Sequence, residues 1–185
     1  EMDMVLSKEF EELILSEGEF VTTSMNSVID DNFIMAPVED QRLFNAVYNN
    51  PLLITPKAGP VDFKKFVAGV GANSIKLISN IISNGSSQGV PLQDMVRQII
   101  GTKKNNYSDG IYNGTRASAE AMVRTSINHI ATQSKLEIYK QNSDIVEGYR
   151  LIATLDTRTS SICKDHDQRV VMPGDTYRPY PPFHP

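Results

Sequence analysis

The chain has 185 residues and a mass of 20.6 kDa, enough for one domain with a real core or for two small ones. Its net charge is −4, and no apolar run approaches the ~18 residues that a membrane span needs. Residues 1–111 hold nine basic and fourteen acidic side chains and residues 112–185 hold nine and eight, so the basic surplus of an autonomous duplex-DNA binder is missing.

The N-terminal half predicts mainly helices. Apolar residues at helix-face spacing indicate a mostly helical stretch over residues 3–33 and a short helix over residues 39–47. Residues 49–60 contain prolines and a glycine that break any helix, so they are expected to form a loop. A further helix is expected over residues 61–83, where Gly69 and Gly71 mark a kink or a close helix contact.

Residues 84–89 are rich in glycine and serine and form the clearest predicted linker. They divide a helical N-terminal region, residues 1–84, from a second part, residues 85–185. Pro91 and Gly101 then bound a helix that ends near Ile100. Residues 103–110 are polar and are expected to form a loop.

A long helix from Arg116 to Asn142 is the strongest single prediction. Apolar residues at 123, 127, 130 and 138 share one face, and Arg124, Asn128, Lys135 and Lys140 lie largely off it. Residues 148–154 have the composition of a strand, with a partner strand at residues 169–172 and a helical turn at 159–165 between them. The tail, residues 176–185, carries four prolines and three aromatic residues and is expected to be extended.

These elements predict an α+β, predominantly α-helical fold. It consists of a helical N-terminal region, a long helix, and a small C-terminal lobe with a short β-hairpin or sheet. The N-terminal region is the candidate for binding a partner, and its acidic balance would suit a basic partner surface. A single cysteine excludes an internal disulfide, which fits a reducing cytoplasm.

Several short segments follow one another in a fixed order from about residue 85. They are Val96–Thr102, Tyr107–Ile111, Val123–His129, Tyr139 with Asn142, Leu155–Cys163 and Pro181–His184. In this order and spacing they resemble the phage Mu F-like minor head proteins, also called head morphogenesis proteins, of tailed double-stranded DNA phages. The resemblance covers roughly 100 of the 185 residues and none of residues 1–84.

The residues that match the motif of this family are Arg124, Thr125, Asn128, Asp156, Arg158, Thr159, Cys163, Asp167 and His184. Two positions depart from the family pattern. Gln168 follows Asp167 where family members have glycine, which predicts a less tight turn. Ser160 stands where many members have a second cysteine.

The resemblance implies a structural part of the virion and no enzymatic activity. Such a protein is made in the host cytoplasm and lies inside the capsid in few copies. There it associates with the portal or the major capsid protein, with packaged DNA as a further contact, and assists head assembly, genome retention or DNA ejection. No membrane contact is implied.

Two alternatives stay open. One is the delivery module of a phage-borne toxin or effector, since the domain of this family is found fused to enzymatic domains. The other is a protein that binds the ends of packaged DNA. This second alternative would require a basic face on the long helix, formed by Arg116, Arg124, Lys135 and Lys140.

Cys163 and His184 are the candidate ligands of a structural zinc ion, because zinc takes four ligands and cysteine and histidine are suitable. His166 or Asp165 would add a third ligand. In the alternative, Cys163 is a small buried apolar residue, His184 packs within the tail, and the protein has no cofactor. No oxyanion-hole signature accompanies Cys163 and no phosphate-binding loop is present, so no catalytic residue is predicted.

Arg124 and Asn128 lie one turn apart on the long helix. They are predicted either to contact DNA or a partner subunit, or to buttress the C-terminal lobe. Tyr177, Tyr180 and Phe183 form either a docking strip for a partner groove or a segment that folds back on its own domain.

Three acidic residues, Asp156, Asp165 and Asp167, cluster around the cysteine turn. Asp156 is expected to close a turn or to cap free amides, in preference to a role as a hydrolytic or Mg²⁺-binding carboxylate. Arg158 is expected to be the charge partner of Asp156 or Asp165.

Overall fold

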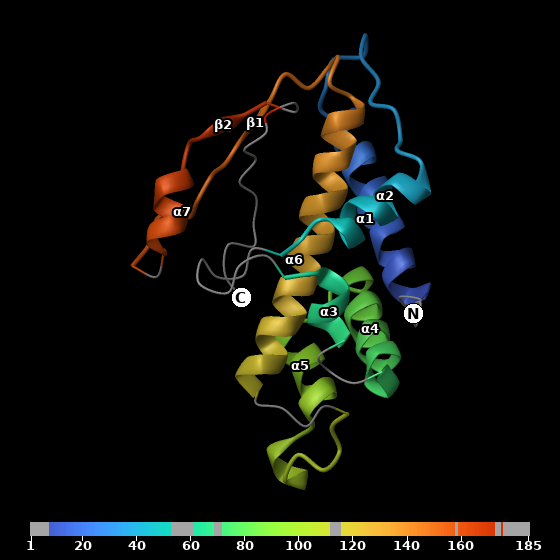
Figure 1. Cartoon of the computed structure of the whole chain (residues 1–185), viewed down its shortest axis with the longest axis vertical. Helices are drawn as coiled ribbons and strands as arrows, with labels where there is room; N and C mark the ends of the chain where they lie inside the picture. The colour runs from blue at the N-terminus through green and yellow to red at the C-terminus, as the bar shows by residue number, and fades with distance from the viewer. Residues whose placement is uncertain are drawn as a thin grey trace.

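The computed structural model describes residues 8–52, 61–68, 72–111, 116–157, 159–172 and 175. The long helix α6, Arg116–Gln141, runs through the middle of the molecule (Figure 1). Shorter helices pack along α6, and a small β arm leaves its C-terminal end. The predicted class, α+β and predominantly helical, is therefore confirmed. None of the described helices has the length and apolar content required to cross a bilayer.

Helices α1, Lys8–Asn26, and α2, Asp40–Asn49, pack against α6. The prediction of helix up to residue 33 is wrong, because α1 ends at Asn26. The Asn26 side chain accepts a hydrogen bond from the Met35 N–H at 2.8 Å and donates to the Met35 carbonyl at 3.3 Å. An asparagine that binds distant backbone in this way competes with continued helix and favours a turn.

The expected helix over residues 61–83 is described as α3, Phe63–Ala68, and α4, Ala72–Ser87. Gly69 and Gly71 lie outside the described residues. The predicted linker is wrong over residues 84–87, which continue α4. Gly85 is buried against the next helix, and a Cβ added there would lie 2.4 Å from the Met95 sulfur. This glycine therefore permits close packing of two helices, and the predicted division between residues 84 and 85 falls inside α4.

The chain turns at Gly89, with φ of +66°, and enters α5, Leu92–Ile100. The predicted bounds of α5 are confirmed: Pro91 precedes its first residue, and Gly101 ends it with φ of +85°. The expected polar loop follows and contains a short 3-10 helix, η1, at Lys103–Asn105.

One hydrophobic core joins α1 to α6. Its fully buried side chains include Phe10, Ile14, Val47, Phe63, Ile78, Ile82, Val96, Ile99, Val123, Ile130 and Ile138. Helix α6 lies at the centre of this core and also buries polar residues, namely Thr125, Ser126, His129, Gln133 and Ser134. A single apolar face, as predicted, therefore describes α6 incompletely, because neighbouring helices cover it on several sides.

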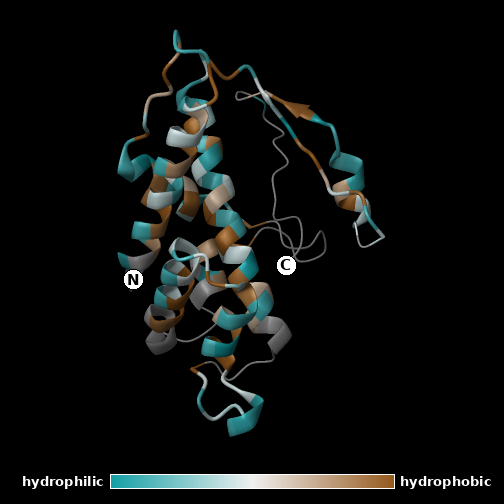
Figure 2. Ribbon diagram, turned by 180° about the vertical axis from the view of Figure 1, so that it is seen from behind, coloured by the Kyte–Doolittle hydropathy of each residue, from teal (hydrophilic) through white to brown (hydrophobic). Residues whose placement is uncertain are grey.

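The arm consists of β1, Tyr149–Arg150, α7, Ser161–His166, and β2, Val170–Val171. The strands pair antiparallel, with Tyr149 opposite Val171 and Arg150 opposite Val170. The predicted strand pair and helical turn are thus confirmed, although both strands are shorter than expected. The arm extends away from α6 (Figures 1 and 2), and hydrophobic residues are visible along it in Figure 2. The tail at 176–185 lies outside the described residues.

Candidate functional site

Asp109 closes the loop that joins α5 to α6. Its Oδ1 accepts a hydrogen bond from the Thr102 N–H at 2.8 Å, and its Oδ2 accepts bonds from Thr102 Oγ1 and Asn105 Nδ2 at 2.9 Å. These bonds, that from the Thr102 N–H above all, lower the pKa of Asp109 to about 2 because they favour the ionised carboxylate. The Ile111 N–H also donates to the Ile99 carbonyl at 2.8 Å. Hydrogen bonds therefore hold together two of the segments that carry the family resemblance, Val96–Thr102 and Tyr107–Ile111.

Gly101 is required by this loop for two reasons. Its φ is +85°, and a Cβ would lie 2.4 Å from Asp109 Oδ1 and 2.6 Å from the Gly110 nitrogen. We expect Gly101→Ala to lower the free energy of unfolding by roughly 2–3 kcal/mol, measured by urea denaturation. Gly89→Ala is the matched control, because Gly89 also has a positive φ, +66°, but faces open space. Equal losses in the two variants would contradict the close packing of the loop.

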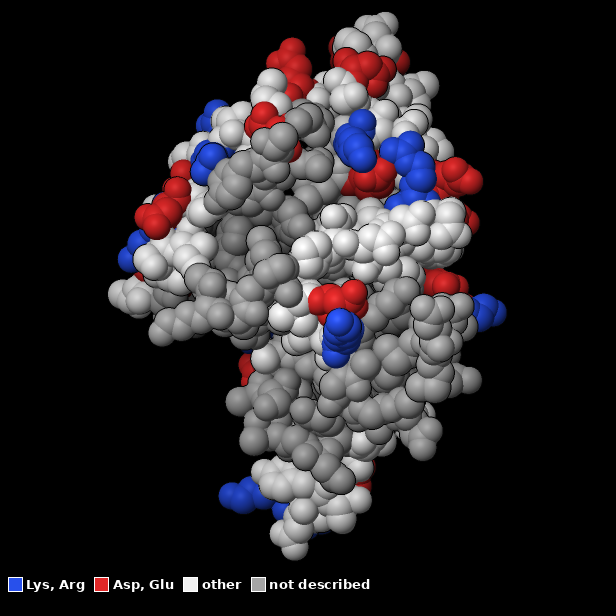
Figure 3. Space-filling model, in the orientation of Figure 1, with Lys and Arg blue, Asp and Glu red and all other residues white. Residues whose placement is uncertain are grey.

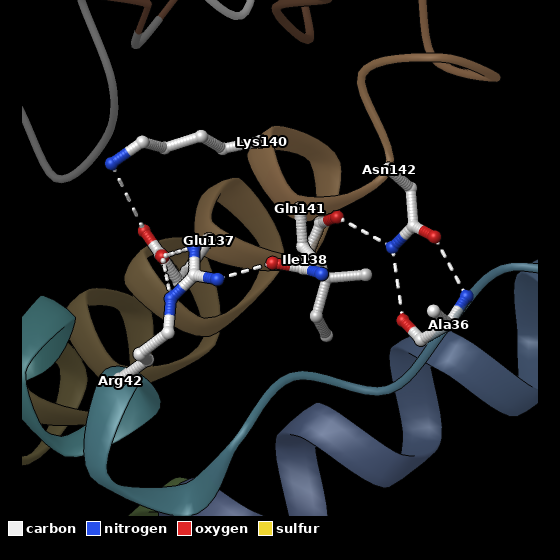
Figure 4. A network of polar contacts seen from close by, with 7 residues as sticks. All are labelled: Ala36, Arg42, Glu137, Ile138, Lys140, Gln141 and Asn142. Atoms are coloured by element: carbon white, nitrogen blue, oxygen red, sulfur yellow. Dashed lines mark hydrogen bonds and ion pairs between the residues drawn. The ribbon is translucent and has the colours of Figure 1, made fainter.

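Asn142 ties the end of α6 to the connection between α1 and α2. Its side chain is buried, and its Oδ1 accepts a hydrogen bond from the Ala36 N–H at 2.6 Å. Its Nδ2 donates to the carbonyls of Ala36, at 3.0 Å, and Ile138, at 2.8 Å (Figure 4). Two segments 106 positions apart are thus joined by one side chain.

A second polar cluster joins α2 to the last turns of α6. Arg42 donates to Glu137 Oε1 from Nε at 3.1 Å and from Nη2 at 2.5 Å, and it also binds Gln141 Oε1 (Figure 4). Lys140 lies 3.8 Å from the other oxygen of Glu137. Because Glu137 is largely covered, this pair holds α2 in register with α6.

The turn before α7 is shaped by hydroxyl groups. Thr159 Oγ1 accepts a hydrogen bond from the Asp156 N–H at 2.8 Å. Ser160 Oγ caps α7 by accepting from the Cys163 N–H at 3.3 Å. Asp156 Oδ1 lies 3.1 Å from Thr159 Oγ1, and the Thr159 N–H donates to the Asp156 backbone carbonyl at 3.2 Å, so Asp156 lies within this turn. The side chain of Arg158 lies outside the described residues.

The turn after α7 is held by Asp167, whose Oδ1 accepts a hydrogen bond from the Ala153 N–H at 2.8 Å. Gln168 has φ of +61°, and its N–H donates to the Leu151 carbonyl at 2.8 Å. Gln168 thus adopts the left-handed backbone that glycine favours, and the expectation of a less tight turn than in family members stays a prediction. A non-glycine residue adopts this conformation at a cost of about 1–2 kcal/mol, which the two flanking hydrogen bonds offset.

Five polar residues within the family resemblance therefore share one role, which is to accept a hydrogen bond from a backbone N–H of their own chain. They are Asp109, Asn142, Thr159, Ser160 and Asp167. Bonds of this kind fix turns, loops and helix caps.

Arg124 and Asn128 are both exposed on α6, one turn apart as predicted. Arg124 forms an ion pair with Glu120 on its own helix at 3.0 Å. The motif residue Thr125, next to Arg124, is buried. Among the described residues, no hydrogen bond joins Arg124 or Asn128 to the arm. Both predicted roles, contact with a partner and support of the C-terminal lobe, therefore stay predictions.

The DNA-end alternative requires a basic face on α6, and the structure describes the side chains of three of its four cations. Each of them lies near an acidic group: Arg124 3.0 Å from Glu120, Lys140 3.8 Å from Glu137, and Lys135 within electrostatic reach of Glu17. On the face seen in Figure 3, basic and acidic side chains are interspersed. The side chain of Arg116 lies outside the described part of the chain.

Cys163 is half-buried on α7, and His166 Nδ1 lies 2.9 Å from the Ile162 carbonyl. The described portion of the chain contains no group of three or more His, Cys, Asp or Glu residues that could hold a metal ion. His184, and with it the predicted zinc site, lies outside that portion. The same holds for the predicted docking strip of Tyr177, Tyr180 and Phe183.

Sequence reasoning missed a groove between α1 and α2. It has a volume of about 280 Å³ and is lined mainly by apolar side chains, with Thr22 and Thr23 also contributing. Its other lining residues include Leu15, Glu19, Val38, Asp40, Leu43 and Ile138. They come from α1, from the connection to α2, from α2 itself and from α6, so no local pattern could have indicated the groove.

The described residues form a mostly helical protein with a projecting β arm, and polar side chains bind the backbone at its loops, caps and turns. No protein-family model, curated protein or solved structure matches the chain.

Proposed function

We propose that the chain is a minor head protein of a tailed double-stranded DNA phage or prophage. It lies inside the capsid, associates with the portal or the major capsid protein, and assists head assembly, genome retention or DNA ejection. It acts by binding, and no covalent bond is made or broken. The ordered segments over residues 85–185 that resemble the phage Mu F-like minor head proteins support this assignment.

One structural observation supports the proposal most strongly. The five polar residues named above bind the backbone of their own chain, at loops, caps and turns. A catalytic site needs such groups to converge on a cavity where a substrate atom can lie. A binding protein instead requires residues that preserve the shape of its backbone, because its function depends on the shape of its surface.

The DNA-end alternative is less well supported, because acidic neighbours offset the described cations of α6. Phosphate contacts would have to come from unpaired lysine or arginine side chains. We expect the purified protein to show no binding to duplex DNA that weakens steeply with added salt.

The test is quantitative mass spectrometry of purified heads from the phage or prophage that encodes the chain. Cleavage after Arg124 and Lys135 releases a peptide of α6 that serves for counting against a labelled standard. We expect a copy number close to that of the portal protein and far below that of the major capsid protein, in both empty and DNA-filled heads. Absence of the peptide from both kinds of head would overturn the proposal.

A further inference from the structure

The outer face of the arm exposes apolar side chains. In the antiparallel pair, Arg150 lies opposite Val170, so both point to the same face of the sheet. Ile152 and Met172 lie two positions beyond Arg150 and Val170, just past the paired residues, and both are also exposed. The exposed fractions are 78% for Ile152, 53% for Val170 and 48% for Met172.

The other face of the same sheet is covered. Tyr149 lies opposite Val171, which is 1% exposed, and the Tyr149 ring packs 6.1 Å from the ring of Tyr139 on α6. The sheet therefore already has an inner face toward its own chain. Its outer face is a second apolar surface, and contiguous surfaces of this kind commonly mark a binding site.

The groove between α1 and α2 is complementary to that face in apolar character and in charge. Leu15, Val38 and Leu43 line it with apolar groups, and its volume of about 280 Å³ accepts an aliphatic side chain. Glu19 and Asp40, both exposed, supply negative charge at the groove. The arm face carries Arg150, an exposed cation, between its apolar residues.

The arm does not reach this groove within one molecule. In both views the arm lies on one side of α6 and helices α1 and α2 lie on the other (Figures 1 and 2). A contact between the two surfaces therefore requires two copies of the chain. Because the surfaces differ, the contact is heterologous and adds copies head to tail, which closes into a ring or extends as a filament.

We propose that copies of this chain self-associate head to tail, with Ile152 of one arm inserted in the α1–α2 groove of the next copy. Arg150 then lies near Glu19 and Asp40 of that copy. The occupant of the groove is thus a second copy of the same protein. This inference does not depend on the proposed function, since it rests on two surfaces of the folded chain.

Sedimentation velocity over a concentration series tests the proposal. We expect the average mass to rise above that of the 20.6 kDa monomer as the concentration increases toward about 200 µM. Ile152→Asp, on the arm, and Thr23→Trp, which blocks the groove at an exposed position, should each weaken association at least about tenfold. Leu77→Asp, on α4, changes an equally apolar exposed side chain outside both surfaces and should leave association unchanged.

A charge exchange distinguishes this contact from unspecific clustering. Arg150→Glu and Glu19→Arg should each weaken self-association, and an equimolar mixture of the two variants should regain it. Circular dichroism confirms that each variant is folded before it is compared. A protein that stays monomeric throughout the series, an association insensitive to Ile152→Asp and Thr23→Trp, or a mixture that regains nothing would each overturn the proposal.

Discussion

Lowering the pH from 7 to 4 is expected to cost the protein roughly 3 kcal/mol of stability through His129 alone. Burial lowers the pKa of this residue to about 4, although its hydrogen bond with Val47 acts in the opposite direction. In the unfolded chain the pKa returns to about 6.5. The stability that the buried, neutral His129 ring contributes is therefore fully present above pH 6.5, and it is lost as the pH falls toward 4.

The surroundings of His129 explain why the protonated ring is unfavourable. Its Nε2 lies 2.8 Å from the Val47 carbonyl, and the ring stacks on Phe63 with centroids 4.7 Å apart. A carbonyl only accepts hydrogen bonds, so the proton of the neutral ring lies on Nε2. A second proton would go to Nδ1, which is buried and has no hydrogen-bond partner among the described residues. A cation without an acceptor would then lie inside the core.

Urea denaturation at pH 7, 5.5 and 4 measures this effect. The matched variant is His129→Gln, which retains a donor toward Val47 and does not titrate. Other acid effects are common to both proteins, so the difference in pH dependence isolates His129. We expect the wild type to lose stability more steeply than the variant below pH 6.5. Parallel curves for the two proteins would show that the histidine is not buried in its neutral form.

Asn142→Ala is expected to lower the free energy of unfolding by about 2–4 kcal/mol. The substitution removes three hydrogen bonds from a side chain that is 3% exposed, and it leaves the Ala36 backbone and the Ile138 carbonyl without that partner. It also releases the connection between α1 and α2 from the end of α6. Thermal and urea denaturation give the size of the loss.

Gln141→Ala is the control for Asn142→Ala. Gln141 is the preceding residue of the same helix end, but it is exposed and binds Arg42 at the surface. Its removal should cost less than about 1 kcal/mol, because water replaces the lost bond. A loss from Asn142→Ala no larger than that from Gln141→Ala would mean that the α1–α2 connection is not anchored through Asn142.

The reliable sequence predictions were those that depend on neighbouring residues. Pro91 and Gly101 bounded α5 correctly, because one fits the start of a helix and the other adopts a positive φ at its end. Apolar spacing placed α2 and α6 to within a few residues. Strand composition with an intervening turn indicated the β1–β2 pair.

The errors arose where a distant residue decided the local structure. Helix α1 ends at Asn26 because that side chain binds Met35, and no helix periodicity records this contact. Gly85 looked like part of a linker, yet it lies inside α4 because Met95 packs over it. Gln168 gave no sign of its left-handed backbone, which the hydrogen bonds on either side impose.

The sequence by itself determined the helical class, the bounds of the clearest helices and the order of segments behind the proposed function. These properties follow from interactions within a few positions of the chain. Only the tertiary structure decided that Asn142 binds Ala36, that His129 is buried, and that a groove lies between α1 and α2. These features depend on which helix faces pack together, so they require contacts between residues far apart in the chain, which a local pattern does not specify.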